Sequence, residues 1–173
     1  MEGTVGGRGR DDGFDEAFDD LFPRAFRLAR RILGDSDAAE DVAAEALARA
    51  YARWPKVAAL PWRDAWVLRV AANLAIDVVR RRGRPAAATA TVTPREDDLA
   101  TLRVALAAAL VALPRRQRQA VALRYLGDLS DGEVAAALGI SAGSVKTHVH
   151  RGLAALRSRL GPDIEEMVPV GVD

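Results

Sequence analysis

Six polar and cationic side chains near the end of the chain have the types and spacing that suit contact with nucleic acid. They share a predicted helix with a regular inward face of Val145, Val149, Leu153 and Leu156. The outward residues are Ser144, Lys146, Thr147, His148, His150 and Arg151. Short polar and cationic groups at the N-terminal end of a helix can reach base edges and phosphates. The chemistry predicted here is therefore DNA recognition.

A second, shorter helix and a tight turn must position these side chains. Ser130 is a predicted N-cap, and Glu133 three residues later completes a capping box. Gly139 ends that helix because glycine can adopt a positive φ without steric cost. Ser141 then caps the outward-facing helix. The pattern predicts a helix-turn-helix.

The charge along this segment has one sign. There is no acidic residue between Val134 and Pro162, whereas Lys146, Arg151 and Arg157 are among its cations. A field of one sign suits a polyanion such as DNA. The alternative is a core helical hairpin with a solvated basic face, but the coincidence of caps, glycine and acid-free helix favours the helix-turn-helix.

The composition bounds the rest of the molecule. The 173 residues allow one domain or two small ones, half of them are hydrophobic, and only 5% are aromatic. Abundant alanine and leucine predict an all-α fold. The net charge of +1 hides an acidic block at residues 34–48 and a basic block at residues 80–84, which predict two kinds of partner surface.

Several classes of protein are excluded or disfavoured. The chain has no cysteine, which excludes a disulfide framework and a cysteine zinc site. Residues 1–13 lack the apolar region of a signal peptide and are expected to be disordered. No apolar run is long enough for a membrane span, so we expect a soluble, cytoplasmic chain with no membrane insertion.

Periodicity divides the chain into two helical modules. In the first module, residues 14–82, helices are expected from about Phe14 to Leu33, Asp37 to Trp54 and Trp62 to Arg82, with a loop from Pro55 to Pro61. The first helix has a stripe formed by Phe18, Phe22, Ala25, Ala29 and Ile32.

Residues 83–98 have no trustworthy period and are predicted to be a flexible linker. The second module, residues 99–160, begins with a helix from about Leu99 to Leu113. A helix from Arg115 to Leu126 and the helix-turn-helix follow.

This organisation resembles the extracytoplasmic-function (ECF) subfamily of sigma-70 family RNA polymerase sigma factors, of the actinobacterial type. The resemblance rests on three segments before the helix-turn-helix: Ala39–Tyr51, Trp66–Asn73 and Leu113–Tyr125. It implies an all-α fold with sigma region 2 in the first module and region 4 in the second. It also implies a factor that binds core polymerase, recognises the −10 and −35 promoter elements and assists strand opening, with no catalysis and no cofactor.

The resemblance assigns roles to particular residues. Asp41 and Glu45 match acidic positions that dock on the β′ clamp, although from their type alone they could form a solvated acidic face. Many members have glutamine where this chain has Ala44. The residues implied to contact the −10 element are Trp62, Arg69, Asn73, Arg80, Arg81 and Arg82.

Some of these residues have structural alternatives. Asn73 could equally be a buried or capping amide, and the arginine run could be solvated. We expect Trp66 to lie in the core. The six outward residues of the last helix are implied to contact the −35 element. The implied partners are core polymerase, through the β′ clamp and the β flap, promoter DNA and an anti-sigma factor.

Two other classes of protein were weighed. Response-regulator-type activators also carry a Val-Lys-Thr-His segment, found here at Val145 to His148, but need a regulatory domain with β–α alternation that residues 1–98 lack. An enzyme is disfavoured because the two histidines, His148 and His150, lie two residues apart and do not share a helix face.

Overall fold

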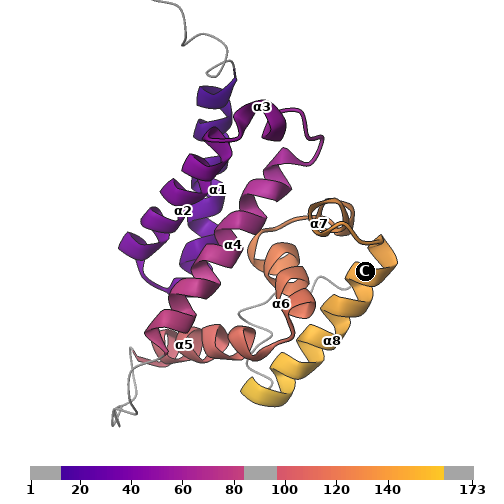
Figure 1. Ribbon diagram of the computed structural model, residues 1–173. Coiled ribbons are helices and arrows are strands. Elements are labelled where there is room, and N and C mark those ends of the chain that lie inside the picture. The colour runs from indigo at the N-terminus through magenta and orange to yellow at the C-terminus, as the bar shows by residue number, and fades with distance from the viewer. Residues whose placement is uncertain (1–12, 84–96, 162–173) are drawn as a thin grey trace, which may run out of the picture.

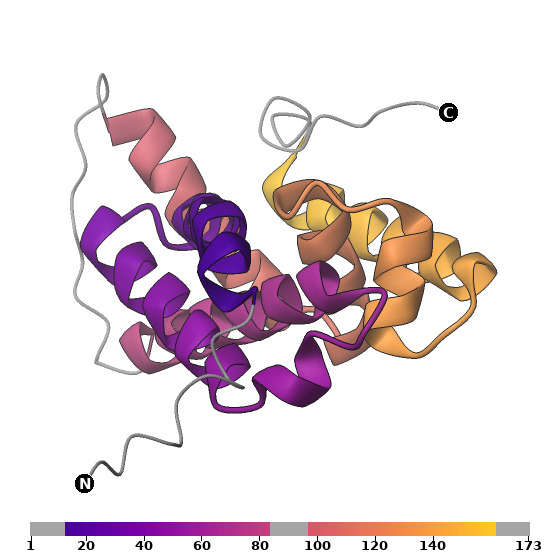
Figure 2. The same cartoon turned by 90° about the horizontal axis from the view of Figure 1, so that it is seen from above.

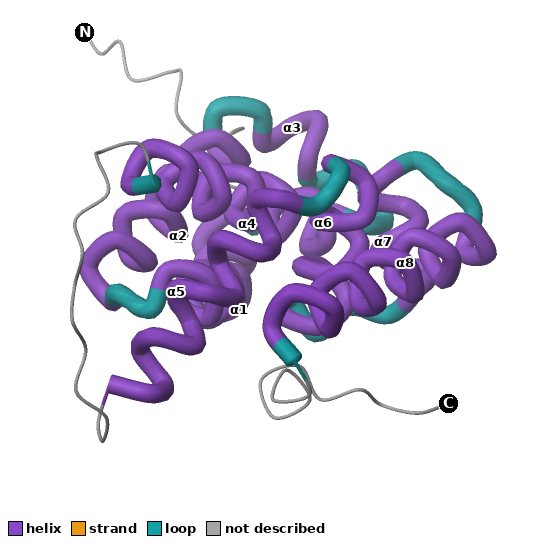
Figure 3. The backbone as a smooth tube through the Cα atoms, turned by 90° about the horizontal axis from the view of Figure 1, so that it is seen from below, coloured by secondary structure: helices purple, strands orange, loops and turns teal. Residues whose placement is uncertain are grey.

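The computed structural model describes residues 13–83 and 97–161, and within these ranges all regular structure is helical (Figure 3). Three sequence predictions lie outside the described residues: the disordered first dozen residues, almost all of the linker with Arg84, and the tail after Gly161.

The N-terminal module is a bundle in which α1, α2 and α4 pack against one another (Figure 1). Its helices are α1 (Phe14–Leu33), α2 (Ser36–Tyr51), α3 (Trp54–Val57) and α4 (Arg63–Arg82). Large aliphatic side chains on the facing stripes, including Leu21, Leu28, Leu47 and Leu68, are at most 1% exposed. Burial of these side chains provides the main stabilisation of the bundle.

Two local predictions for this module are wrong. The second helix ends at Tyr51, and Trp54 begins the separate turn α3, because Pro55 fits the first turn of a new helix. Trp54 is 3% exposed and meets the Phe14 ring edge-on at 5.0 Å. Phe18 is 37% exposed, since the inward positions of α1 are taken by Leu21 and Leu28 instead.

The C-terminal module contains α5 (Asp97–Ala112), α6 (Arg115–Val121), a π-helical turn η1 (Ala122–Leu126), α7 (Asp131–Leu138) and α8 (Ala142–Leu160). The expected helix over residues 115–126 is therefore present, but its last five residues have π-helical hydrogen bonding. Helix α8 packs along α6 and α7, and the buried Arg118 donates to the carbonyls of Val111 and Leu113 at 2.8 and 2.9 Å.

The two modules pack against each other. Helix α5 contacts α1 and α4 as well as α8, while α7 and η1 contact α4 (Figure 2). The approach is close at Gly127, where a Cβ would lie 3.0 Å from Leu28 Cδ1 of the other module. Buried apolar side chains form one cluster that continues across the boundary. Periodicity predicts the two modules but contains no information on this packing.

Candidate promoter and polymerase interfaces

The start of α7 is fixed by reciprocal hydrogen bonds, as the sequence predicts. The Glu133 backbone N–H donates to Ser130 Oγ at 3.3 Å, while the Ser130 backbone N–H donates to the Glu133 carboxylate at 2.8 Å. These hydrogen bonds, that of the Ser130 hydroxyl first, hold the pKa of Glu133 below its ordinary value. The capping box is confirmed.

The turn before α8 also has the expected geometry. Gly139 has a φ of 65°, and the following Ile140 N–H donates to the Ala135 carbonyl at 3.1 Å. Ser141 Oγ accepts from the Ser144 N–H at 3.1 Å and caps α8. Because both ends of the turn are fixed, α8 is held rigidly against α7.

Helix α8 presents most of the predicted −35 residues to solvent. The side chains of Lys146, Thr147, His150 and Arg151 are exposed. Ser144 and His148 are only partly exposed. The opposite face is buried, with Val145 and Leu156 at 0% exposure. The described outward face has the charge and accessibility that contact with a phosphate backbone requires.

The predicted polymerase-docking residues lie on the outer face of α2. Asp41 and Glu45 are exposed, one helical turn apart. Glu45 accepts from Arg49 Nε at 2.7 Å, whereas Asp41 has no ion pair among the described residues. Ala44 is also exposed, between them in sequence. The face can therefore meet a basic partner without any rearrangement of the bundle.

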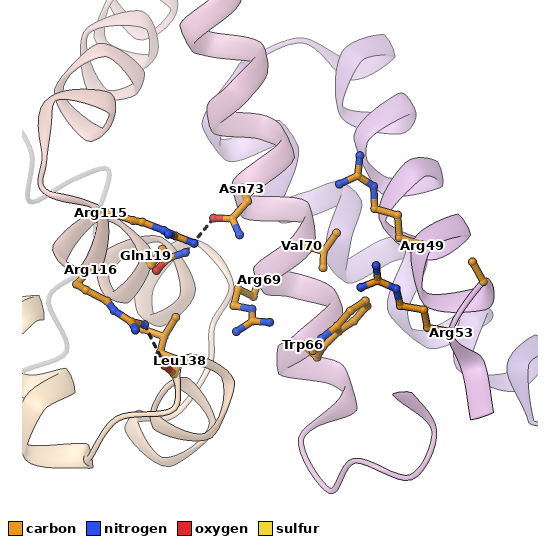
Figure 4. A pocket seen from close by; sticks show the side chains of 11 residues that line it. Arg49, Arg53, Trp66, Arg69, Val70, Asn73, Arg115, Arg116, Gln119 and Leu138 are labelled. Atoms are coloured by element: carbon orange, nitrogen blue, oxygen red, sulfur yellow. Dashed lines mark hydrogen bonds between the residues drawn. The ribbon is translucent and has the colours of Figure 1, made fainter. Parts of the chain in front are cut away.

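Two predicted −10 residues make hydrogen bonds to the other module. Arg69 donates through Nη1 to the carbonyl of Ala137 in α7. The Asn73 amide oxygen accepts from Gln119 Nε2 of α6 at 3.1 Å, as Figure 4 shows. Both side chains are partly buried. In this arrangement both groups are hydrogen-bonded to the C-terminal module instead of a DNA strand.

The other predicted −10 residues are accessible. Trp62, at the start of α4, is 37% exposed, and Arg80, Arg81 and Arg82 are exposed at its end. Arg82 pairs with the Asp35 carboxylate at 2.9 Å. The structure thus separates these residues into an exposed set and the two that face the C-terminal module.

Asp35, the N-cap of α2, was not among the predicted site residues. Its pKa is held below the ordinary value, first by the Ala38 backbone N–H and then by Arg82. Trp66, which was expected in the core, is partly buried: it packs against the buried cluster and also borders a cavity.

Sequence reasoning missed the residues that meet between the modules. Arg31 of α1 donates to the Leu126 carbonyl at 2.8 Å and pairs with Asp128 at 2.7 Å. Arg115 and Arg116 of α6 lie across a cavity from Arg49 and Arg53. The sequence shows each of these arginines, but no pattern in it reveals that Arg49 and Arg53 face Arg115 and Arg116.

Comparison with known families decides the identity of the two modules. Residues 17–85 match the family described as Sigma-70 region 2, and residues 103–156 match Sigma-70, region 4. The chain belongs to the sigma-70 family of RNA polymerase sigma factors. As a sigma factor it binds core RNA polymerase and directs transcription initiation, with region 4 contributing a DNA-binding helix-turn-helix.

Relatives of this sigma factor place it in the ECF subfamily. The RNA polymerase sigma-E factor of Streptomyces coelicolor is 38% identical over 118 residues, which are 66% of this chain and 67% of the relative. The ECF RNA polymerase sigma factor SigE of Mycolicibacterium smegmatis is 35% identical over 114 residues, 60% of this chain and 44% of the relative. The resemblance inferred from the sequence is confirmed, and the family has no enzymatic activity of its own.

Solved structures have the same fold. CnrH in complex with the cytosolic domain of CnrY superposes with a TM-score of 0.62 at 24% identity, covering 90% of this chain and 92% of that one. The sigma factor RpoE in complex with the anti-sigma factor NepR from Bartonella quintana gives 0.56 at 23% identity, covering 88% and 99%. Within the described residues of this sigma factor, no helix has the length and apolar character needed to cross a membrane.

Proposed function

We propose that this sigma factor contacts core polymerase through Asp41 and Glu45, the −10 element through α4, and the −35 element through α8. The observation that carries the proposal is the capped helix-turn-helix, which fixes α8 with Lys146 and Arg151 directed to solvent. Those cations suit phosphate contacts, whereas the acidic face of α2 repels DNA and suits a basic protein surface.

The contacts of Arg69 and Asn73 imply that the modules separate before the −10 element is bound. Both groups are hydrogen-bonded to the C-terminal module, so the arrangement described here is a closed form of the free chain. Contact with a melted −10 strand requires the modules to separate. Binding to core polymerase supplies the free energy for that separation, because docking sites on the β′ clamp and the β flap hold the two modules apart.

Charge reversal tests the polymerase contact. Asp41→Arg with Glu45→Arg should weaken binding to core polymerase by well over tenfold, because like charges then face one another. Both positions are exposed, so helical content and thermal stability should remain near wild type. Glu16→Arg with Asp19→Arg on α1 is the matched control, since those residues are exposed and lie outside the α2 face. Equal loss of binding in both double variants would contradict the assignment.

Truncation of the cations on α8 tests the DNA contact. Loss of a phosphate contact should weaken promoter binding by the holoenzyme at every sequence and lower the salt slope by about one. Loss of a base contact should instead relax the preference at one position of the −35 element. Lys146→Ala and Arg151→Ala are therefore compared with Arg159→Ala at the exposed end of α8. If neither substitution affects promoter-dependent transcription, α8 does not contact the −35 element as proposed.

Regulation and location follow from the same proposal. Of the two similar structures, CnrH was solved in complex with the cytosolic domain of CnrY, and the sigma factor RpoE in complex with the anti-sigma factor NepR. We infer that an anti-sigma factor also controls this chain, because a bound protein can hold the two modules together and hide the polymerase-docking face. A cytoplasmic location accompanies the interaction with core polymerase.

A further inference from the structure

A cavity of about 570 Å³ lies between the modules and is lined by five arginines. Arg49, Arg53 and Arg69 come from the N-terminal module, and Arg115 and Arg116 come from α6 (Figure 4). No acidic side chain is among the described residues that line it. The other polar groups of its wall are the amides of Asn73 and Gln119 and the indole of Trp66.

The positive charge of this cavity is only partly balanced within the chain. Arg49 pairs with Glu45 at 2.7 Å. Arg116 donates to the Leu138 carbonyl at 2.9 Å, and Arg69 donates to the neighbouring Ala137 carbonyl, so both meet the negative end of the α7 dipole. A carbonyl accepts a hydrogen bond but carries no net charge, so it neutralises neither cation.

The two remaining cations have no counterion among the described residues. In the parts of the chain that the structure describes, the side chains of Arg53 and Arg115 make no hydrogen bond and no ion pair, and both are exposed at the cavity. Burial, followed by the charges of Arg116 and Arg115, lowers the pKa of Arg69. Like charges are therefore close enough to repel one another across the module boundary. An anion in the cavity would relieve this repulsion.

We propose that the cavity binds a small polyphosphate, either an inorganic chain or the phosphates of a nucleotide, and that the ligand holds the two modules together. Guanidinium groups match phosphoryl oxygens in charge and in forked geometry. A ligand with several charges can contact Arg53 on one side and Arg115 on the other, whereas chloride cannot span the two. The Trp66 ring offers a surface for a nucleobase if the ligand carries one.

The ligand would act on initiation by mass action. Because two of the arginines belong to the C-terminal module, the full site exists only in the closed arrangement. A ligand that binds the closed form alone shifts the equilibrium toward it. The effect of the ligand on transcription rests on the proposed function, in which the modules must separate. The binding of the ligand does not depend on that function.

Calorimetric titration of the full chain with sodium tripolyphosphate tests the binding, with thermal unfolding as a second readout. We expect saturable binding and a higher Tm. Arg53→Ala and Arg115→Ala should each weaken binding by about tenfold or more, because each removes a charge-assisted contact. Neither side chain has a partner to lose within residues 13–83 and 97–161, so both variants should fold. Arg27→Ala, which removes an exposed arginine on α1, is the control for net charge and should bind as wild type does.

Two further titrations distinguish the sources of the anion. Tighter binding of GTP than of tripolyphosphate supports a nucleotide site at Trp66, and equal binding supports a site for the phosphate chain alone. Absence of saturable binding, or equal weakening by Arg27→Ala, overturns the proposal. The proposal is also overturned if a short single-stranded oligonucleotide binds more tightly than tripolyphosphate and loses affinity in the same Arg53 and Arg115 variants. The cavity would then be part of a DNA-binding surface. None of these titrations uses polymerase or promoter, so their failure leaves the proposed function standing.

Discussion

At the scale of single residues, one glycine in the middle of α8 determines how closely this helix approaches α6. A Cβ at Gly152 would lie 2.6 Å from Cγ2 of Val121, whose side chain is 1% exposed. Glycine normally weakens a helix interior, so its presence here has a packing reason. The sequence shows a glycine among helical residues, but only the structure shows the contact that requires it.

Substitution of this glycine should therefore destabilise the C-terminal module. Gly152→Ala should lower the free energy of unfolding by about 1–3 kcal/mol through overpacking, measured by thermal or urea unfolding. Gly143→Ala is the matched control in the same helix, where the nearest atom lies at 3.9 Å, and it should be neutral or slightly stabilising. Val121→Ala in the Gly152→Ala background should restore part of the loss. A stable Gly152→Ala variant would show that α6 and α8 adjust freely.

At the scale of elements, local chemistry predicted the helix ends well. The capping box of α7, the left-handed Gly139 and the Ser141 cap all depend on residues within four positions of one another, which a sequence displays directly. The boundary after α2 was missed because Pro55 was read as ending that helix, whereas it lies in the first turn of α3, whose Trp54 packs against the distant Phe14. Likewise, Arg69 and Asn73 were predicted as −10 contacts, but their partners in the other module could not be.

The capping box predicts a particular pH dependence. Because the pKa of Glu133 is lower in the folded state, its ionised form stabilises α7. That contribution is complete above the ordinary value of 4.5 and is lost as the pH falls through the lowered folded pKa. Glu133→Ala should cost about 1 kcal/mol at pH 7, and its difference from wild type should shrink in acid.

Unfolding measured between pH 7 and pH 3 checks this dependence. Glu16→Ala is the control, since this exposed first-turn carboxylate of α1 makes no capping hydrogen bond. A destabilisation by Glu133→Ala that stays the same at every pH would contradict a role for the charged carboxylate.

At the scale of the whole molecule, the arrangement of the modules is what the sequence could not supply. Each module has its own apolar stripes, and these predicted its helices, while the resemblance of three segments and the helix-turn-helix predicted the family. Besides the apolar cluster that continues across the boundary, the modules make polar contacts, among them Arg31 with Asp128, Arg69 with Ala137, and Asn73 with Gln119. Each arises from residues 46 or more positions apart, so no local pattern announces them.

These polar contacts also suit an interface that must open. Exposed ion pairs contribute little stability, and Arg31 and Asp128 keep 44% and 68% of their side chains exposed. A partner that binds the separated modules more tightly must offset the shared apolar cluster as well as these polar contacts. Closure in the free chain and separation on the polymerase form the central claim about this sigma factor.

A distance between the modules, measured in the free chain and in the holoenzyme, tests that claim most directly. The chain has no native cysteine, so Asp19→Cys on α1 and Ser158→Cys on α8, both at exposed positions, accept spin labels selectively. Pulsed electron spin resonance should give one narrow distance distribution for the free chain and a separate, longer distribution once core polymerase is bound. The same distribution in both states would contradict the account, because Arg69 and Asn73 would then remain covered during initiation.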